Sequence, residues 1–474
     1  MFRQPKPFYM IFFIEMWERF GYYGMQAIMV LYLVKKAGLT DAQAFNTYSA
    51  FTALIYSVIA IGGYIGDNIL GTKRTILLGA IFLAIGYAIL GIPSQNCMFY
   101  GMGMIVAGNG FFKANPSSLL SKCYQENDPR LDGAFTLYYM AINIGSLSAM
   151  LSVPIIESHT NWQVGFSVCS LGLVIGILNY FYFYKTVKHI DSEAGKLPVR
   201  FLRTLLPIIV GGVITAGIAS YVLRHIIIAH SVLVVMALSI LVMFFVEIAK
   251  AEPELRGKLI AALILIIQGM LFFILYQQMP TSLNFYAINN IRHFILGFPV
   301  NPLSFQALNP FWIFIMSPIL AAIYTKLGSK GKDLSMPSKF TLGVTLCACS
   351  FLILSLSKYF ADAHGMVSSW WIIISYFFQS TGELLVSGLG LAMVAHLVPQ
   401  RLMGFIMGAW FMGSASGIIL GGFIAGLTSV PNNVPPGLYS LNLYASVFGK
   451  LGLGSLIVAI IMAIFIPKLK KMMQ

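Results

Sequence analysis

Residues 228–248 read IAHSVLVVMALSILVMFFVEI, and the one acidic residue of this run, Glu247, stands near its end. A helix needs roughly 20 mostly apolar residues to cross the hydrocarbon core of a bilayer. The whole chain of 474 residues has the same character: 58% are hydrophobic, 10% are charged, and the mean hydropathy is +0.82. Soluble globular proteins carry about 25% charged residues. The composition therefore predicts an all-α protein that crosses the membrane many times.

Fourteen such runs are expected to span the membrane, as two six-helix bundles with an extra two-helix hairpin between them. The longest charged linker, from Lys185 to Arg203, follows the sixth span. We therefore expect an N-terminal bundle at 1–184, a cytoplasmic linker with the hairpin at 185–257, and a C-terminal bundle at 258–474. The spans are predicted near 8–34, 46–70, 75–92, 97–120, 133–156, 164–184, 203–222, 228–248, 258–282, 305–327, 338–358, 368–397, 401–428 and 442–467.

The formal net charge is +14, from 30 Lys and Arg against 16 Asp and Glu. Most of the bases fall in short loops between apolar runs, a distribution that indicates membrane topology rather than nucleic-acid binding. On one predicted face we count 22 Lys and Arg, and on the opposite face six. Because bases gather on the cytoplasmic side and an even number of spans returns the chain to its starting side, both termini are predicted to be cytoplasmic.

Residue patterns for covalent chemistry or metal binding are missing from the sequence. The five cysteines show no CxxC spacing, and the seven histidines form no HExxH motif. Neither GxSxG nor a Walker lysine loop occurs. We therefore expect no disulfide framework, no metal site, no bound cofactor and no catalytic residue, and the chain is not expected to be an enzyme.

The clearest charged residues inside predicted spans are Glu15, Glu18, Arg19, Lys113 and Glu383. A charged side chain at mid-membrane costs roughly 2.5–3.5 kcal/mol on insertion scales. Left unpaired, the five would cost on the order of 12–17 kcal/mol, more than the stability of a typical domain. They are therefore expected to face one another or an aqueous cavity.

The first span places its charges on one stripe. One face of the expected helix carries positions i, i+3, i+4, i+7 and i+11, which are Glu15, Glu18, Arg19, Tyr22 and Gln26. A structural ion pair with Arg19 is one interpretation. The other is that two carboxylates against a single base leave one able to carry a proton.

Lys113 and Glu383 are the other intramembrane charges. Lys113 is followed by Pro116, which weakens the helix and exposes backbone groups to a cavity. A lysine that reaches the membrane interface is the alternative interpretation. Glu383 has Ser387 one turn later and only apolar sequence neighbours, so a substrate amine would serve as its partner.

Asp67, Lys73 and Arg74 form another charged group, at the end of the second predicted span. They belong to the pattern Gly63-x-x-x-Asp67-x-x-x-Gly71-Thr-Lys73-Arg74. This is predicted to be a cytoplasmic turn that acts as a gate or a structural charge network, not as a substrate site.

These motifs resemble those of the proton-dependent oligopeptide transporter family, a branch of the major facilitator superfamily. The first-helix signature ExxERFxYYG is intact from Glu15 to Gly24. Further matches, in the order expected for the family, cover essentially the whole chain: Asn109-Gly-Phe-Phe-Lys113, Phe135-Thr-Leu-Tyr-Tyr139-Met-Ala-Ile-Asn143-Ile-Gly145-Ser146, Phe305-Gln-Ala-Leu-Asn309-Pro310 and Gly382-Glu383-Leu-Leu-Val-Ser387. Within the family, Gln278-Met-Pro-Thr-Ser-Leu-Asn-Phe-Tyr is similar to the enterobacterial di- and tripeptide permeases.

The resemblance implies proton-coupled import of dipeptides and tripeptides by alternating access, with the proton as the coupling ion. It assigns proton coupling to Glu15 and Glu18, together with Arg19 and Lys113. The resemblance also implies the residues that bind the substrate. The peptide carboxylate would bind Arg19 and Lys113, and the amino terminus would bind Glu383, Asn143 and Asn309. The peptide backbone would contact Tyr23, Tyr56 and Tyr139, one pocket wall would be Trp410, and further lining residues would be Gln26, Gln277 and Ser387.

Two positions depart from the family pattern. Many relatives have a carboxylate where this chain has Gln277, and many have Arg where it has Gln26. Gln277 cannot carry a proton as a carboxylate could, which argues against a proton pathway through the seventh helix of the family. Gln26 leaves the cavity with one cation fewer.

The resemblance also sets the expected location and partners. The short stretch between Lys358 and Ser368 indicates a bacterial chain, and hence a multi-pass protein of the inner membrane. Its expected partners are peptides and membrane lipids, with no nucleic acid, and it is expected to function as a monomer. Transport of another small solute or anion by the same fold is the alternative function.

Overall fold

A computed structural model gives the structure of the protein for residues 4–125, 128, 130–330, 334–397, 399–431 and 434–473. The chain divides into two compact units. Unit 1 contains Met1–Tyr32 and Leu54–Ile228, and unit 2 contains Leu33–Ala53 and Ala229–Gln474. The three-part division at 184 and 257 stays a prediction.

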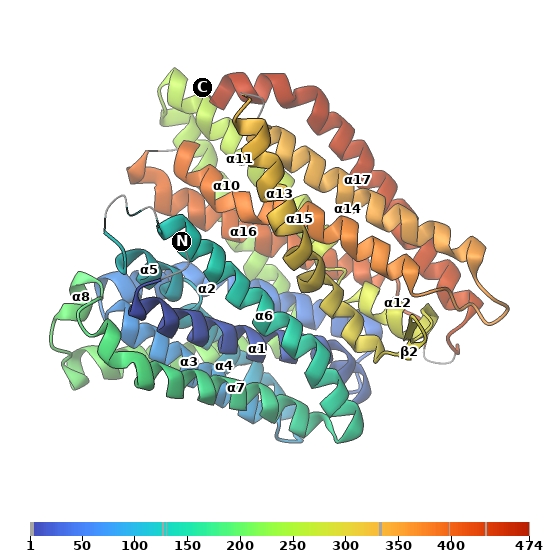
Figure 1. The fold of residues 1–474 in the computed structure, drawn as a ribbon, viewed down its shortest axis with the longest axis horizontal. Helices are drawn as coiled ribbons and strands as arrows, with labels where there is room; N and C mark the ends of the chain where they lie inside the picture. The colour runs from blue at the N-terminus through green and yellow to red at the C-terminus, as the bar shows by residue number, and fades with distance from the viewer. Residues whose placement is uncertain are drawn as a thin grey trace. The chain divides into compact units, whose positions relative to one another are not determined.

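Unit 1 is built from long helices joined by short connections (Figure 1). Helix α2 (Asp41–Asn68) begins in unit 2 and ends in unit 1. The other elements of unit 1 are α1 (Lys6–Lys35), α3 (Thr72–Leu90), α4 (Gln95–Phe112), α5 (Asn115–Lys122), α6 (Leu131–His159), α7 (Trp162–Phe183), η1 (Tyr184–Val187), α8 (Glu193–Lys196), η2 (Phe201–Leu205) and α9 (Leu206–Arg224).

Unit 2 is also mostly helical, with one short antiparallel β-hairpin in its described part. Its elements are α10 (Ile226–Lys250), α11 (Pro253–Tyr276), α12 (Ser282–Asn290), β1 (Phe294–Ile295), β2 (Phe298–Pro299), η3 (Pro302–Ala307), α13 (Leu308–Gly328), α14 (Met336–Leu356), η4 (Ser357–Phe360), α15 (Trp370–Leu397), α16 (Gln400–Gly426) and α17 (Leu438–Met473).

Each of the fourteen predicted spans lies mostly in helical residues, which confirms the predicted all-α class. Within the described residues, eleven helices are long and apolar enough to cross a membrane by length and composition. The three other predicted spans correspond to α1, α4 and α15. Helix α1 carries Glu15, Glu18 and Arg19 in its middle, and these charges lower its hydropathy.

The predicted span 97–120 is not one continuous helix. Helix α4 ends at Phe112, and α5 begins at Asn115. Because Pro116 has no N–H group, it cannot donate to the carbonyl of Phe112. The side chain of Asn115 supports the break by donating from Nδ2 to the carbonyl oxygen of Phe111 at 2.6 Å. The same residues that weaken the helix thus place Lys113 at its end.

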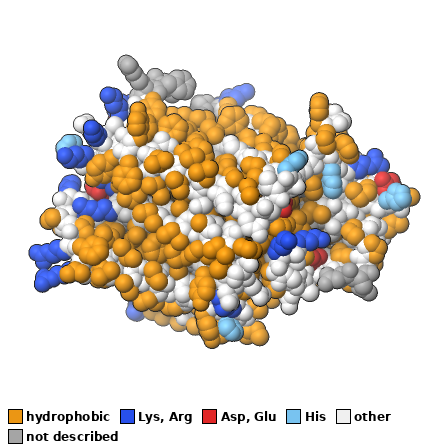
Figure 2. Space-filling view, turned by 90° about the horizontal axis from the view of Figure 1, so that it is seen from below, with side chains coloured by type: hydrophobic (Ala, Val, Ile, Leu, Met, Phe, Trp, Pro, Cys, Tyr) orange, Lys and Arg blue, Asp and Glu red, His pale blue; other side chains and the backbone are white. Residues whose placement is uncertain are grey.

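Apolar side chains make up much of the surface. They cover most of the face that Figure 2 shows, and Lys and Arg side chains are most frequent toward its edges. Helix α10 shows the pattern within one element, since only Ala229, Leu233 and Phe244 are buried along it. A helix with so little burial is suited to lipid, where an apolar surface meets an apolar solvent.

Candidate functional site

The predicted stripe on α1 forms a buried ion-pair cluster. Arg19 Nε lies 2.9 Å from Glu15 Oε1 and 2.7 Å from Glu18 Oε2. All three residues are at most 5% exposed. The single hydrogen on Nε is donated to Glu15. The Glu18 oxygens therefore keep acceptor capacity that no described residue fills with a hydrogen bond.

Lys113 belongs to the same cluster. Its Nζ lies 4.1 Å from the centroid of the Tyr56 ring, a cation–π contact from the end of α4 to α2. It also interacts electrostatically with Arg19, Glu18 and Glu15. The structure thus brings together the four residues predicted to handle the proton. Their full charges would sum to zero, which limits the cost of placing them in the membrane.

Close helix contacts position Lys113. A Cβ atom built on Gly62 of α2 would lie 1.6 Å from the carbonyl oxygen of Gly110 on α4. Any residue other than glycine would separate the two helices at this point. This contact lies one turn before Lys113, so it holds the lysine near Tyr56 on α2.

Helix α6 adds a residue that the sequence-based prediction missed. Tyr138 is 8% exposed and interacts electrostatically with Glu15 and Arg19. Tyr139, the next residue, is 36% exposed, and its predicted contact with the peptide backbone stays a prediction. Adjacent residues of a helix point about 100° apart, so the motif alone does not tell which tyrosine faces α1.

The other predicted residues of unit 1 lie on the same two helices, α1 and α6. Asn143 is 6% exposed and donates from Nδ2 to the carbonyl oxygen of Tyr139 at 2.8 Å. Gln26 is 9% exposed. Tyr23 packs edge-on against Tyr22, whose ring lies 5.9 Å from the Arg19 guanidinium carbon. These residues place amide and aromatic groups near the charged cluster.

Unit 2 contains a second polar cluster, around Glu383 on α15. Asn309, at the start of α13, donates from Nδ2 to Glu383 Oε2 at 2.7 Å and to Ser380 Oγ at 3.1 Å. Glu383 is partly exposed, and it makes no ion pair with any described residue. The structure therefore joins the predicted Glu383 and Asn309 and leaves the carboxylate without a cation among the described residues.

Two other predicted residues of unit 2 differ in exposure. Ser387 is exposed one turn after Glu383. Trp410 is 4% exposed, and its ring packs against Phe273 and Phe340, with centroids 6.5 Å and 6.0 Å away. Trp410 is thus part of the packed interior of unit 2 in this structure, and its role as a pocket wall stays a prediction.

Gln277 lies where the predicted span 258–282 divides into α11 and α12. Its side chain is 2% exposed and donates from Nε2 to Ser49 Oγ at 2.9 Å. Ser49 lies in the first part of α2, within unit 2. The structure thus gives this neutral amide a definite partner that the sequence did not reveal.

At the end of α2, Asp67 pairs with a base that the sequence did not indicate. Asp67 Oδ1 lies 2.6 Å from Lys122 Nζ, on α5, and accepts a hydrogen bond from Ser118 Oγ at 3.2 Å. Lys122 also donates to Thr72 Oγ1 at 3.0 Å. The ion pair therefore ties α2, α3 and α5 together.

Lys73 and Arg74 bind the linker instead of Asp67. Lys73 Nζ donates to the carbonyl oxygens of Val187 and Lys188, at 2.7 Å and 3.0 Å. Arg74 donates to the carbonyl oxygen of Leu197 at 3.1 Å. These contacts support a structural role for both bases.

Metal binding has no candidate site among the described residues, because no group of three or more His, Cys, Asp or Glu side chains there could hold an ion. All five cysteines are free. The polar clusters consist of acids, bases and amides, which bind charged groups and exchange protons.

The sequence matches known proteins over its full length. The model of the POT family matches residues 73–442. Dipeptide and tripeptide permease B of Salmonella typhimurium (strain LT2) is 53% identical over 476 residues, covering 100% of this chain and 97% of the permease. The permease of the same name from Aeromonas hydrophila subsp. hydrophila is 50% identical over 477 residues, covering 100% of this chain and 95% of that one.

Solved structures of the same kind match the fold. The crystal structure of tetrameric PepTSo2 gives a TM-score of 0.89 at 38% identity, covering 98% of this chain and 99% of that chain. The peptide transporter POT in complex with sulfate gives 0.87 at 27% identity, covering 100% and 96%. These matches confirm the predicted major facilitator fold. This chain is therefore a multi-pass membrane protein that belongs to the POT family.

Proposed function

We propose that this chain is a proton-coupled symporter that imports dipeptides and tripeptides. The observation that carries the proposal is the distribution of charge. Unit 1 holds Arg19 and Lys113, and unit 2 holds Glu383, which has no ion-pair partner among the described residues. A peptide is a zwitterion, and its carboxylate matches the bases while its ammonium group matches Glu383.

The proton is carried by the carboxylates of α1. Glu15 accepts the Nε hydrogen of Arg19 through Oε1, whereas neither oxygen of Glu18 accepts a hydrogen bond from a described residue. Protonation of Glu18 reduces its attraction for Arg19 and leaves the guanidinium more available to a peptide carboxylate. Proton binding and peptide binding are in this way coupled through one base.

The energetics suit accumulation of a neutral peptide. One charge that crosses a potential of about 100 mV supplies roughly 2.3 kcal/mol. This corresponds to a concentration gradient of about fifty-fold. One proton for each peptide is therefore enough for uphill import.

The proposal includes the topology and the assembly. With 22 bases on one predicted face against six on the other, both termini lie in the cytoplasm of a bacterial cell. Both polar clusters are formed by residues of a single chain, which favours a monomer as the transporting species. Reporter fusions at both ends test the first statement, and the mass of the protein in nanodiscs tests the second.

Uptake into proteoliposomes tests the function. Purified protein is reconstituted, and an inward proton gradient or a membrane potential is imposed separately. We expect labelled dialanine to accumulate above equilibrium under either force and tripeptides to compete with it. Accumulation of a small anion such as nitrate, with no competition by dialanine, would establish the alternative of another solute.

A further inference from the structure

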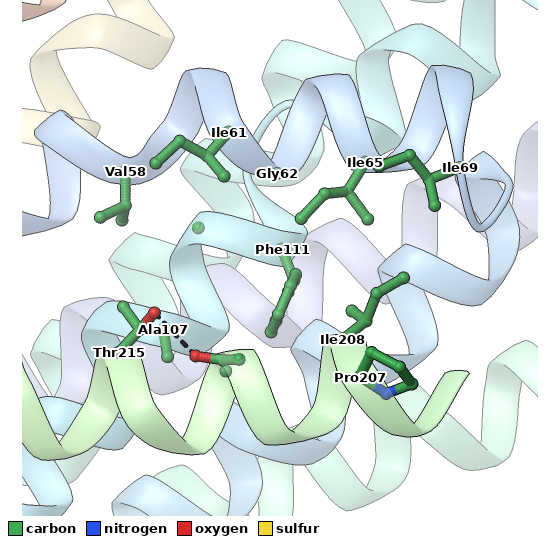
Figure 3. A pocket seen from close by; sticks show the side chains of 13 residues that line it. Val58, Ile61, Gly62, Ile65, Ile69, Ala107, Phe111, Pro207, Ile208 and Thr215 are labelled. Carbon is green, nitrogen blue, oxygen red and sulfur yellow. Dashed lines mark hydrogen bonds between the residues drawn. The ribbon is translucent and has the colours of Figure 1, made fainter. Parts of the chain in front are cut away.

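An apolar groove on the surface of unit 1 continues into a polar pocket. The groove has a volume of about 330 Å³ and lies between α2, α4 and α9 (Figure 3). The polar pocket, of about 680 Å³, is formed by the end of α2 and the linker before α9. Ile69 lines both. The groove is lined by large apolar residues such as Val58, Ile61, Ile65, Phe111, Pro207 and Ile208.

The groove presents almost no polar atoms. Figure 3 shows the side chains of Ile61 and Ile65 on the side of α2 that faces α9. The hydroxyl of Thr215 donates to the carbonyl oxygen of Gly211 at 2.8 Å, so it is satisfied within α9. Ile61 is 60% exposed and Ile69 43%. The groove therefore opens on the surface of unit 1 and suits a hydrocarbon chain.

The length of the groove matches one leaflet of a bilayer. It follows α2 from Val58 to Ile69, about 16 Å at 1.5 Å per residue. The hydrocarbon core of a bilayer is about 30 Å thick, so one leaflet contributes about half of that. The polar pocket lies at the end of the groove near Ile69, where a lipid of that leaflet carries its headgroup.

The charges of the polar pocket favour an anion. Its two acids already have cations, since Asp67 pairs with Lys122 at 2.6 Å and Glu193 with Lys196 at 2.5 Å. Arg200 is exposed and forms no ion pair with any residue in the described part of the chain. A guanidinium group binds the oxygens of a phosphate through paired hydrogen bonds.

We propose that the groove and the polar pocket together bind one anionic phospholipid. Its phosphate contacts Arg200, and one acyl chain lies between α2 and α9. The lipid bridges the hairpin helix α9 and the transporting bundle of unit 1. None of its lining residues belongs to the charged cluster around Arg19 or to the polar cluster around Glu383, so the site is distinct from the residues proposed to bind the peptide.

Native mass spectrometry of the full chain in a neutral detergent measures the binding. The probes are dioleoyl phosphatidylglycerol, dioleoylglycerol, which has the same chains without the phosphate, and glycerol 3-phosphate, which has the phosphate without the chains. Wild type is expected to retain phosphatidylglycerol about fivefold better than dioleoylglycerol, the contribution of one base near a membrane surface. Glycerol 3-phosphate, which lacks acyl chains, is expected to show only weak, non-specific binding.

Two glycines of α9 supply matched variants for the groove. A Cβ atom added at Gly211 or at Gly217 would meet nothing within 4 Å, but only Gly211 lines the groove. Gly211→Leu fills space that the acyl chain needs. Displacing two methylenes, each contributing about fourfold, weakens phosphatidylglycerol about tenfold or more. Gly217→Leu is expected to bind as wild type does, and equal melting temperatures show that both variants fold.

Two arginines supply the matched variants for the headgroup. Arg200→Gln is expected to abolish the preference for phosphatidylglycerol over dioleoylglycerol. Arg203→Gln, which removes a base that does not line the pocket, is expected to keep it. Equal lipid binding by Gly211→Leu and Gly217→Leu would overturn the proposal. Competition by glycerol 3-phosphate that equals that of phosphatidylglycerol would also overturn it, because the ligand would then be a soluble anion. Binding of dioleoylglycerol to wild type that equals the binding of phosphatidylglycerol would overturn it as well, because the ligand would then be apolar.

Discussion

The role of Glu383 can be tested by removing its charge without changing its shape. In Glu383→Gln the side chain keeps an oxygen that can accept the hydrogen bond from Asn309, now 2.7 Å long. Removing one partner of a desolvated charge pair costs about 2–5 kcal/mol. Because Glu383 is partly exposed, we expect the lower end, about 2 kcal/mol. That corresponds to about a thirty-fold loss of affinity for a free ammonium group.

Acetylation of the substrate isolates this interaction. N-acetyl-dialanine lacks the ammonium group but keeps the carboxylate and the peptide bond. We expect wild type to bind dialanine about thirty-fold more tightly than N-acetyl-dialanine, and Glu383→Gln to bind the two almost equally. The assay is competition of both compounds against uptake of a labelled dipeptide in proteoliposomes.

A matched carboxylate provides the control. Glu157, on α6, is also partly exposed but lies outside the polar clusters. Glu157→Gln should keep the wild-type ratio of the two affinities. If Glu383→Gln also keeps that ratio, Glu383 does not bind the amino terminus. The ratio is unaffected by changes in the amount of active protein, so a partly unstable variant still gives an answer.

Three further predictions follow from the two units. Glu18→Gln should abolish gradient-driven accumulation of dialanine yet leave counterflow exchange partly intact, and normal uphill uptake would contradict its role as the proton carrier. Gln277→Ala should change the affinity for dialanine by up to about tenfold while the pH optimum of uptake stays the same, because an amide does not titrate. A shifted optimum would refute this. Gly145→Ala should lower the free energy of unfolding by about 1–3 kcal/mol, because its Cβ would lie 2.2 Å from the carbonyl oxygen of Met16. Gly133→Ala, on the same helix, meets nothing closer than 3.7 Å and should have little effect on melting followed by tryptophan fluorescence.

The sequence by itself determined the membrane class and the positions of the spans. A bilayer imposes a fixed length of apolar helix, so hydropathy located elements such as α2 and α10. The same solvent makes charges rare, and the exceptions therefore stood out. Glu15, Glu18 and Arg19 lie on one helix, and their contact followed from helical spacing.

Only the tertiary structure decided which residues from different helices meet. The sequence placed Asp67 beside Lys73 and Arg74, yet its partner is Lys122. Gln277 pairs with Ser49, more than two hundred residues away. Such pairs depend on how each helix is rotated about its axis, and that rotation is set by close packing against its neighbours. A difference of one residue in a helix turns a side chain by about 100°, so the sequence alone could not show that Tyr138 lies near Glu15.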